Sequence, residues 1–373
     1  EDAGKAHQPA GSPERKVGDL YTSYMDSARV EKLGTAPLAP ELERMESLRN
    51  ASELPATFAH FARFGVSGPV GVFVGADAKH STVNIVQLSQ SGLGMPDRNY
   101  YLKQDPKMVA ARAAYVAYIT QMLTLAKQPD PAGAANRILA LETQIATPQW
   151  ERARTRDRDA TYNKMTVAEL AAMTPSFSWK RYLDAAGLSK ATEVVVRQPD
   201  YVKSLDPIYR NTPVSTWREY LTFRLIDNFA DELPSAFVQA RFEFRGKTLN
   251  GQQELAVRWK RAVDGTNSSL GEAAGTLYIS KYFKPEAKAR MDALVTNIIN
   301  AYKVGIDRRE GMSPETRGQA RGEAAPLPGA GARGGGWGTA PTDPGSPPPA
   351  RSPGGSVESR FSATSPTAPR SRR

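Results

Sequence analysis

Three histidines, His7, His60 and His80, are the only imidazole side chains in this sequence of 373 residues, and cysteine is absent. A hydrolytic zinc site needs about three protein ligands and an open coordination position for water. No histidine stands four residues from another, and the zinc-binding sequence His-Glu-x-x-His does not occur. We therefore predict no metal ligand and no catalytic residue in this chain, and we interpret the three histidines as structural or surface side chains.

Three other patterns that could support catalysis or binding are weaker. A Ser-His-Asp triad would have to combine distant residues, and no Gly-x-Ser-x-Gly turn supports one. The run Gly329–Gly334 has the spacing of a dinucleotide-binding loop, but its flanks are rich in Pro and Gly instead of forming a strand and a helix. The triplet 333–335 (Arg-Gly-Gly) near Trp337 could stack on RNA bases, although functional segments usually repeat it. We predict no specific nucleic-acid partner.

The composition divides the chain into three zones. Residues 1–15 are polar and predict a disordered leader, whereas residues 16–312 carry periodic apolar patterns and predict a folded region. Residues 313–373 are rich in Pro, Gly, Ser, Ala and Arg, so they cannot bury enough apolar area to offset the chain entropy and predict a disordered tail. Within the net charge of +10, this tail contributes eight arginines against four acidic residues. The remaining charge does not by itself indicate an anionic partner.

The folded zone has a helical period almost throughout. No run reaches the roughly 18 apolar residues of a membrane span, and no signal peptide is visible. One stretch alternates instead: Val70–Val74 and Thr82–Leu88 predict a small β-hairpin. The fold class is therefore mainly α, a large helical domain with a small β-hairpin followed by the disordered tail. The predicted helices are 109–123, 138–145, 166–173 with a capping box of Thr166 and Glu169, 217–229 ended or kinked by Pro234, and 285–302.

The stretch Gln90–Leu102 (Gln-Ser-Gly-Leu-Gly-Met-Pro-Asp-Arg-Asn-Tyr-Tyr-Leu) directly follows the predicted hairpin. It resembles the Gln-x-Gly-Leu-x-Leu-Pro-Asp-x-x-Tyr-Tyr-Leu motif of neprilysin-type zinc metalloendopeptidases, a family that includes endothelin-converting enzymes and bacterial oligopeptidases. Further segments resemble the family in the same order between about residues 16 and 320: Leu141–Trp150, Arg156-Asp157, Thr161–Asn163, Trp217–Leu221, Phe242–Lys247, Arg258–Arg261, Leu270–Tyr278 and Met312–Arg317. The family's opening segment before Lys16 is not recognised.

The resemblance implies a two-lobed, mainly helical enzyme that uses zinc to hydrolyse short peptides. In the family, the ion is held by His-Glu-x-x-His with a downstream Glu-x-x-x-Asp, and an Asn-Ala-x-Tyr segment binds the substrate. These motifs lie C-terminal to the matched region, and none occurs here. No site residue is carried over, the substrate-binding residues remain unknown, and no zinc is predicted to be held by this chain. The implied partners are short peptides, and the implied compartment is periplasmic or extracellular.

Within the resembling motif, the residue types predict structural roles. Gly92 and Gly94 are expected to adopt backbone angles that other residues avoid, and Pro96-Asp97 is expected to set a turn. Tyr100, Tyr101 and Leu102 are expected to anchor that turn against a core. The Trp-Lys-Arg triplets at 179–181 and 259–261 are expected to be solvated helix faces, each with a buried tryptophan.

The tail interrupts the resemblance, which stops after Ala320. Beyond that point the residues are mainly those encoded by GC-rich codons, so we interpret the tail as the product of a shifted reading frame, with a genuine linker as the alternative. The leading hypothesis is a truncated zinc metalloendopeptidase that is inactive as this chain. The alternative is a non-catalytic, peptide- or protein-binding helical module. We also expect self-association, because helices such as 285–308 would lack the lobe against which they pack.

Overall fold

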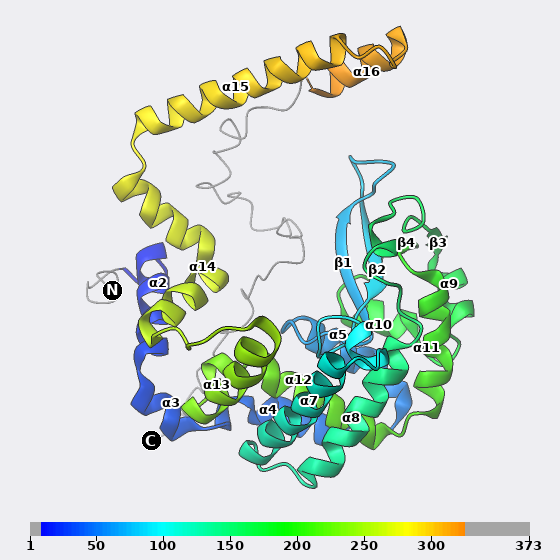
Figure 1. Ribbon diagram of the computed structural model, residues 1–373, viewed down its shortest axis with the longest axis vertical. Helices are drawn as coiled ribbons and strands as arrows, with labels where there is room; N and C mark the ends of the chain where they lie inside the picture. The colour runs from blue at the N-terminus through cyan, green and yellow to red at the C-terminus, as the bar shows by residue number, and fades with distance from the viewer. Residues whose placement is uncertain (1–8, 325–373) are drawn as a thin grey trace, which may run out of the picture. The chain divides into compact units, whose positions relative to one another are not determined.

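The computed structural model of the chain describes residues 9–324 (Figure 1). Most of the predicted leader, up to residue 8, and the predicted tail beyond residue 324 lie outside the described residues. The described chain divides into two compact units. Residues 24–260 form the larger unit, and residues 9–23 together with 261–324 form the smaller one. The mainly α fold class predicted from the sequence is confirmed.

Helices make up most of the larger unit. Three of its long helices begin at a proline, whose fixed backbone angle and missing N–H suit the first helical position. The α-helices are α3 (Ser27–Leu33), α4 (Ala39–Ser47), α5 (Leu54–Ala62), α6 (Asn99–Leu102), α7 (Pro106–Leu125), α8 (Pro131–Ala146), α9 (Val167–Met173), α10 (Trp179–Ala185), α11 (Pro199–Asn211), α12 (Val214–Asn228) and α13 (Ser235–Arg241). Short 3₁₀ turns are η1 (Ala36–Leu38), η2 (Ala51–Glu53), η3 (Arg154–Arg156) and η4 (Ala230–Glu232), and η5 (Phe242–Leu249) is a π-helix.

The predicted helices of this unit are confirmed, and their ends have identifiable causes. The capping box forms as predicted: the Thr166 hydroxyl accepts a hydrogen bond from the Glu169 amide, and the Glu169 carboxylate accepts one from the Thr166 amide. Helix α12 ends at Asn228, before Pro234, which instead precedes α13. Sequence spacing therefore placed these elements correctly.

A four-stranded mixed sheet contains the predicted hairpin. Strands β1 (Val70–Ala76) and β2 (Asn84–Gln90) pair antiparallel, which confirms the hairpin. Strand β4 (Glu193–Val196) then pairs parallel with β2 and antiparallel with β3 (Lys164–Thr166), giving the order β1-β2-β4-β3. The sequence analysis did not predict β3 and β4, because three- and four-residue strands carry too little alternation to be recognised.

The core of the larger unit surrounds α12. This helix packs against α4, α7 and α8, which also lie beside one another in Figure 1. Trp217, Leu221 and Leu225 on α12 are completely buried, as is Ile119 on α7. Each large apolar side chain removed from water contributes about 1.5–3 kcal/mol. The larger unit therefore has a continuous core of its own, drawn from residues 38–244.

The smaller unit is built from helices with little buried apolar surface. It contains most of α2 (Pro13–Met25) and α14 (Arg258–Tyr282), together with α15 (Pro285–Asp307) and α16 (Pro314–Ala324). The helix predicted at 285–302 is confirmed, and it has no buried residue. Helix α14 is interrupted by non-helical backbone at Leu270. No described helix combines the length and apolarity that crossing a bilayer requires.

Two sequence expectations differ from the structure in this part of the chain. Residues 314–324 were assigned to the disordered tail but form α16, because Pro314 suits its first turn and the Ser313 hydroxyl accepts a hydrogen bond from the Thr316 amide. Trp179 is buried as expected, but Trp259 is 52% exposed. The expectation of a buried tryptophan was therefore wrong for Trp259, where little core surrounds α14.

Candidate functional site

The described histidines do not form a metal centre. The His60 ring nitrogen Nε2 lies 2.7 Å from a carboxylate oxygen of Glu41, so this side chain joins α5 to α4. His80 lies in the turn between β1 and β2, with its backbone amide bonded to the Asp77 carbonyl. His7 lies outside the described residues. Among residues 9–324, no three His, Asp or Glu side chains come together as ligands for an ion.

The segment Gln90–Leu102, which we call the motif loop, contains two glycines required for different reasons. Gly92 has φ +91°, and a Cβ there would also lie 2.7 Å from the Pro69 backbone. Gly94 does not have a positive φ. A Cβ at Gly94 would lie 1.8 Å from the Tyr115 hydroxyl oxygen. The expected backbone role is thus correct for Gly92 and wrong for Gly94, which is needed because it has no side chain.

This close approach predicts the effect of a methyl group at Gly94. We expect Gly94→Ala to lower the free energy of unfolding by about 1–3 kcal/mol, because the core must shift to accept it. The closest atom is the Tyr115 hydroxyl, so Tyr115→Phe should relieve part of the clash. In urea unfolding, the double variant should lose less stability than the two single variants added together. Strict additivity would contradict this explanation.

Side chains from α11, α12, the π-helix and the residues after α8 hold the backbone carbonyls of the motif loop. The Tyr220 hydroxyl donates to the Gly92 carbonyl at 2.8 Å, and Arg224 donates to the Leu93 carbonyl at 3.0 Å. Further donors to the loop are Gln149 to Ser91 (2.8 Å) and Arg245 to Gly94 (3.1 Å), and Tyr201 donates to Pro69, just before β1 (2.6 Å). A buried carbonyl without a donor is costly. These contacts therefore fix one conformation of the loop.

Glu142 on α8 accepts further hydrogen bonds from the motif loop. Its carboxylate accepts the Gly94 amide at 3.2 Å, the Tyr101 hydroxyl at 2.5 Å and the Tyr115 hydroxyl at 3.0 Å. The residue is completely buried. Burial raises the pKa of Glu142 above its ordinary value, and the Arg224 guanidinium opposes that shift only in part. The Tyr101 anchor predicted from the sequence is thus present, with Glu142 as its partner.

A second buried carboxylate, Asp227 on α12, joins α7 to the α13–η5 segment. It accepts the Tyr118 hydroxyl at 2.6 Å, Arg241 at 3.2 Å and Arg245 at 3.0 Å. Arg245 also donates to its other oxygen, so this contact is bidentate. Burial favours the neutral acid, but the guanidinium groups, Arg245 before Arg241, outweigh it and hold the pKa of Asp227 below its ordinary value. Arg245 in turn reaches the motif loop.

These two carboxylates connect distant elements of the larger unit. The hydrogen-bond partners of these carboxylates are tyrosines, arginines and a backbone amide, which tie helices and the motif loop together. Sequence reasoning missed both. The sequence does contain a pattern that could have indicated them. Glu142 lies on the apolar helix face formed by Ile138 and Leu141, and Asp227 directly follows the apolar Ile226. Charged residues at core positions of a helix indicate buried pairs.

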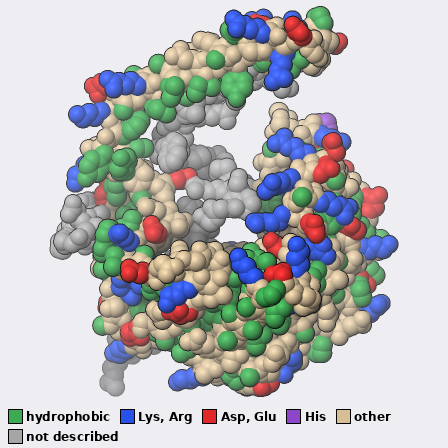
Figure 2. All heavy atoms as spheres, in the orientation of Figure 1, with side chains coloured by type: hydrophobic (Ala, Val, Ile, Leu, Met, Phe, Trp, Pro, Cys, Tyr) green, Lys and Arg blue, Asp and Glu red, His purple; other side chains and the backbone are tan. Residues whose placement is uncertain are grey.

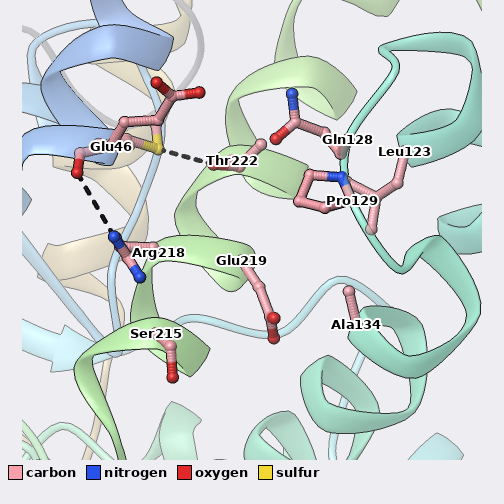
Figure 3. A pocket seen from close by; sticks show the side chains of 10 residues that line it. Glu46, Leu123, Gln128, Pro129, Ala134, Ser215, Arg218, Glu219 and Thr222 are labelled. Atoms are coloured by element: carbon pink, nitrogen blue, oxygen red, sulfur yellow. Dashed lines mark hydrogen bonds between the residues drawn. The ribbon is translucent and has the colours of Figure 1, made fainter.

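A pocket with mixed chemistry lies in the larger unit, and we call it the α12 pocket (Figure 3). Its volume is about 310 Å³, and it lies between α4, the α7–α8 connection and α12. Its floor includes the buried Met45, Leu123 and Ala134. The remaining lining comes from α12, including Arg218 and Glu219, from Glu46 on α4, and from Gln128 and Pro129 in the α7–α8 connection. The sequence analysis did not predict this site, since its residues are far apart along the chain.

Exposed apolar side chains are concentrated in the helices at the end of the described chain. Figure 2 shows hydrophobic side chains along α14 and α15. The exposed side chains on one face of α15, which we call the α15 stripe, are Met291 (49%), Leu294 (49%), Ile298 (47%) and Tyr302 (68%). Their spacing of three or four residues is that of a helix face made for burial. The stripe predicted from the sequence is therefore present.

Comparisons with known proteins agree on one family. Residues 1–324 match the model described as peptidase family M13. Endothelin-converting enzyme 1 of Mus musculus is 25% identical over 326 residues, which cover 83% of this chain and 42% of that protein. Endothelin-converting enzyme-like 1 of Homo sapiens is 28% identical over 333 residues, which cover 84% and 42%. The family model matches from residue 1, whereas the resemblance noted in the sequence began at about residue 16.

A similar solved structure is Mycobacterium tuberculosis zinc metalloprotease ZMP1 in complex with an inhibitor. It is 38% identical, with a TM-score of 0.79 over 87% of this chain and 49% of that chain. The open state of the same protein gives a TM-score of 0.77 over 87% and 50%. The chain spans less than half the length of the curated relatives described above. It belongs to peptidase family M13, and its residues 1–324 correspond to the N-terminal region of that family.

Proposed function

We propose that this chain is the non-catalytic N-terminal part of a zinc metalloendopeptidase and does not hydrolyse peptides by itself. One observation carries the proposal: residues 9–324, which correspond to the N-terminal region of the relatives, hold no set of metal ligands. The similar ZMP1 structures are named as those of a zinc metalloprotease. In such an enzyme, the zinc ion would be held by residues outside the matched region.

The surface of α15 supports the same proposal. A helix with no buried residue and an apolar face contributes little stability by itself, because helices depend on tertiary packing. The larger unit has a continuous buried core, whereas α15 in the smaller unit has no buried residue. We infer that the α15 stripe is covered by the remaining half of the peptidase when that half is present. By the same family argument, we propose that the complete enzyme hydrolyses short peptides and that its compartment is periplasmic or extracellular.

A peptide-hydrolysis assay tests the proposal. We expect the purified chain to leave a set of short fluorogenic peptides intact, with added zinc and without it, because residues 9–324 hold no group of metal ligands that could activate water. The control is a complete M13 peptidase assayed at the same concentration. Turnover by this chain that a chelator abolishes would overturn the proposal.

The second candidate function is a peptide- or protein-binding helical module that performs no chemistry. The specific observation in its favour is the independent core of the larger unit, which indicates that it can fold without a second lobe. The genomic DNA after the Ala320 codon separates the two candidates. A His-Glu-x-x-His sequence in another reading frame would indicate an interrupted enzyme, and its absence would favour the module.

A further inference from the structure

The α12 pocket combines an apolar floor with an unpaired cation. Met45, Leu123 and Ala134 are each 1% exposed, so the floor is continuous with the core of the larger unit. The Arg218 guanidinium at the side of the pocket donates only to the Glu46 backbone carbonyl, at 3.4 Å (Figure 3). Within residues 9–324, no carboxylate lies within ion-pair distance of Arg218. A partly buried guanidinium of this kind readily binds a planar carboxylate.

The acidic residues of the pocket do not neutralise Arg218. The Glu219 carboxylate is held by Arg137 through contacts of 2.8 and 2.9 Å, and Arg137 also binds Asp130. The carboxylate of Glu46 points away from Arg218, which receives only the backbone carbonyl of that residue (Figure 3). The positive charge available to an incoming ligand is therefore the Arg218 guanidinium. The Glu46 carboxylate lies separately, at the rim of the pocket.

Ser215 adds a second polar group next to Arg218. It stands three residues earlier on α12, so the two side chains share one face of the helix. The N-cap of α12 is Pro213, which makes no side-chain capping bond. The lining of the pocket thus contains a hydroxyl one helical turn from the guanidinium. These groups complement a carboxylate, and the floor beneath them complements an apolar side chain.

We propose that the α12 pocket binds an α-carboxylate that carries an apolar side chain, the group presented by a free apolar amino acid or by the C-terminal residue of a peptide. Arg218 and Ser215 bind the carboxylate, and the side chain lies against Pro129, above the floor of Met45 and Leu123. The pocket volume of about 310 Å³ is at the lower end of the range for ligand pockets, which extends to roughly 1,000 Å³. A pocket of this size suits a ligand of one amino-acid residue. This site is independent of zinc and of the proposed peptidase role.

Ligand titration of the full chain tests the proposal without any substitution. The chain is labelled at its methionine methyl groups, and the Met45 resonance is assigned with a Met45→Leu variant. Leucine, N-acetyl-leucine and leucinamide are then titrated in turn. We expect a saturable shift of the Met45 resonance with N-acetyl-leucine, and none with leucinamide, which lacks the carboxylate. Equal shifts from both, or no saturable shift from either carboxylate, would overturn the proposal.

The comparison of the two carboxylates identifies the source of the ligand. Binding of leucine alone would mean that the free ammonium is required and that the ligand is an amino acid. Binding of N-acetyl-leucine as well would mean that peptide C-termini are accepted. Both outcomes support the carboxylate site. The peptidase assay and this titration use different residues, so failure of one does not imply failure of the other.

A matched pair of substitutions tests the role of the guanidinium. We expect Arg218→Gln to weaken carboxylate binding at least about tenfold, the effect of losing a charge-assisted hydrogen bond. The control is Arg210→Gln, which removes an exposed arginine in the last turn of α11, away from the pocket lining. That control should bind normally. Unchanged affinity in Arg218→Gln, with an unfolding transition like that of the unsubstituted chain, would contradict the assignment.

Discussion

Replacing Asp227 by alanine should lower the free energy of unfolding of the larger unit by about 3–5 kcal/mol, the effect of breaking a buried ion pair. The substitution removes the one carboxylate shared by the Arg241 and Arg245 guanidiniums and the Tyr118 hydroxyl, all largely buried. Because Arg245 also binds the Gly94 carbonyl, the motif loop should loosen as well. Urea unfolding followed by tryptophan fluorescence measures the loss, since Trp217 lies in the same core.

A matched control uses the other partner of Arg241. The Asp231 side chain also contacts this arginine, at 3.1 Å, but it is 49% exposed. We expect Asp231→Ala to cost no more than about 1 kcal/mol, because water screens an exposed pair. Equal losses from the two alanine substitutions would contradict the central role of Asp227.

The pH dependence of the Asp227 effect has a definite sign. The pKa of this carboxyl is lower in the folded chain than its ordinary value, so its contribution is present above the unfolded pKa of about 3.9. That contribution is lost as the pH falls through the folded pKa. The difference in stability between the unsubstituted chain and Asp227→Asn should therefore be constant near neutral pH and shrink in strong acid. A difference that grew on acidification would contradict the pairing.

Concentration-dependent association through the α15 stripe is the second large effect that we expect. The stripe leaves roughly a few hundred Å² of apolar surface in water, the size at which patches become association sites. At about 25 cal/mol per Å², covering it contributes several kcal/mol. Sedimentation should show oligomers that dissociate on dilution, and an apolar dye should bind strongly. The double substitution Leu294→Gln and Ile298→Gln should weaken association at least about tenfold.

The control for the stripe uses polar positions of the same helix. Asn297 and Asn300 are exposed, so Asn297→Gln with Asn300→Gln changes side-chain size on α15 without changing its apolar residues. This control should associate like the unsubstituted chain. A monomeric, dye-silent unsubstituted chain with a sharp unfolding transition would show that α15 needs no partner, and would favour the binding-module function.

Local patterns predicted much of the fold. The helix at 285–302 and the capping box at Thr166 depend on spacings of three or four residues, which remain readable in the sequence. Strand β4 could not be recognised in this way, because its parallel partner β2 lies about a hundred residues earlier and only the folded chain brings them together. The extent of α16 was missed because its composition is that of a loop, while its cap lies at Ser313.

The sites show a sharper limit of sequence reasoning. Motif matching found the motif loop, since its residues are contiguous, but not the reason for Gly94, which lies in the distant Tyr115. The α12 pocket is assembled from separate helices, so no short pattern indicates it. Glu142 could have been noticed as a charge on an apolar helix face. Its three hydrogen-bond donors required the structure.

Metal analysis of the purified chain tests the central claim most directly. The chain is incubated with excess zinc, dialysed against metal-free buffer and measured for zinc per polypeptide by atomic emission. Because no group of metal ligands exists among the described residues, we expect far less than one equivalent to remain. Retention of one zinc ion per chain, released by a chelator together with any peptidase activity, would contradict the assignment of this chain to the non-catalytic part of the family.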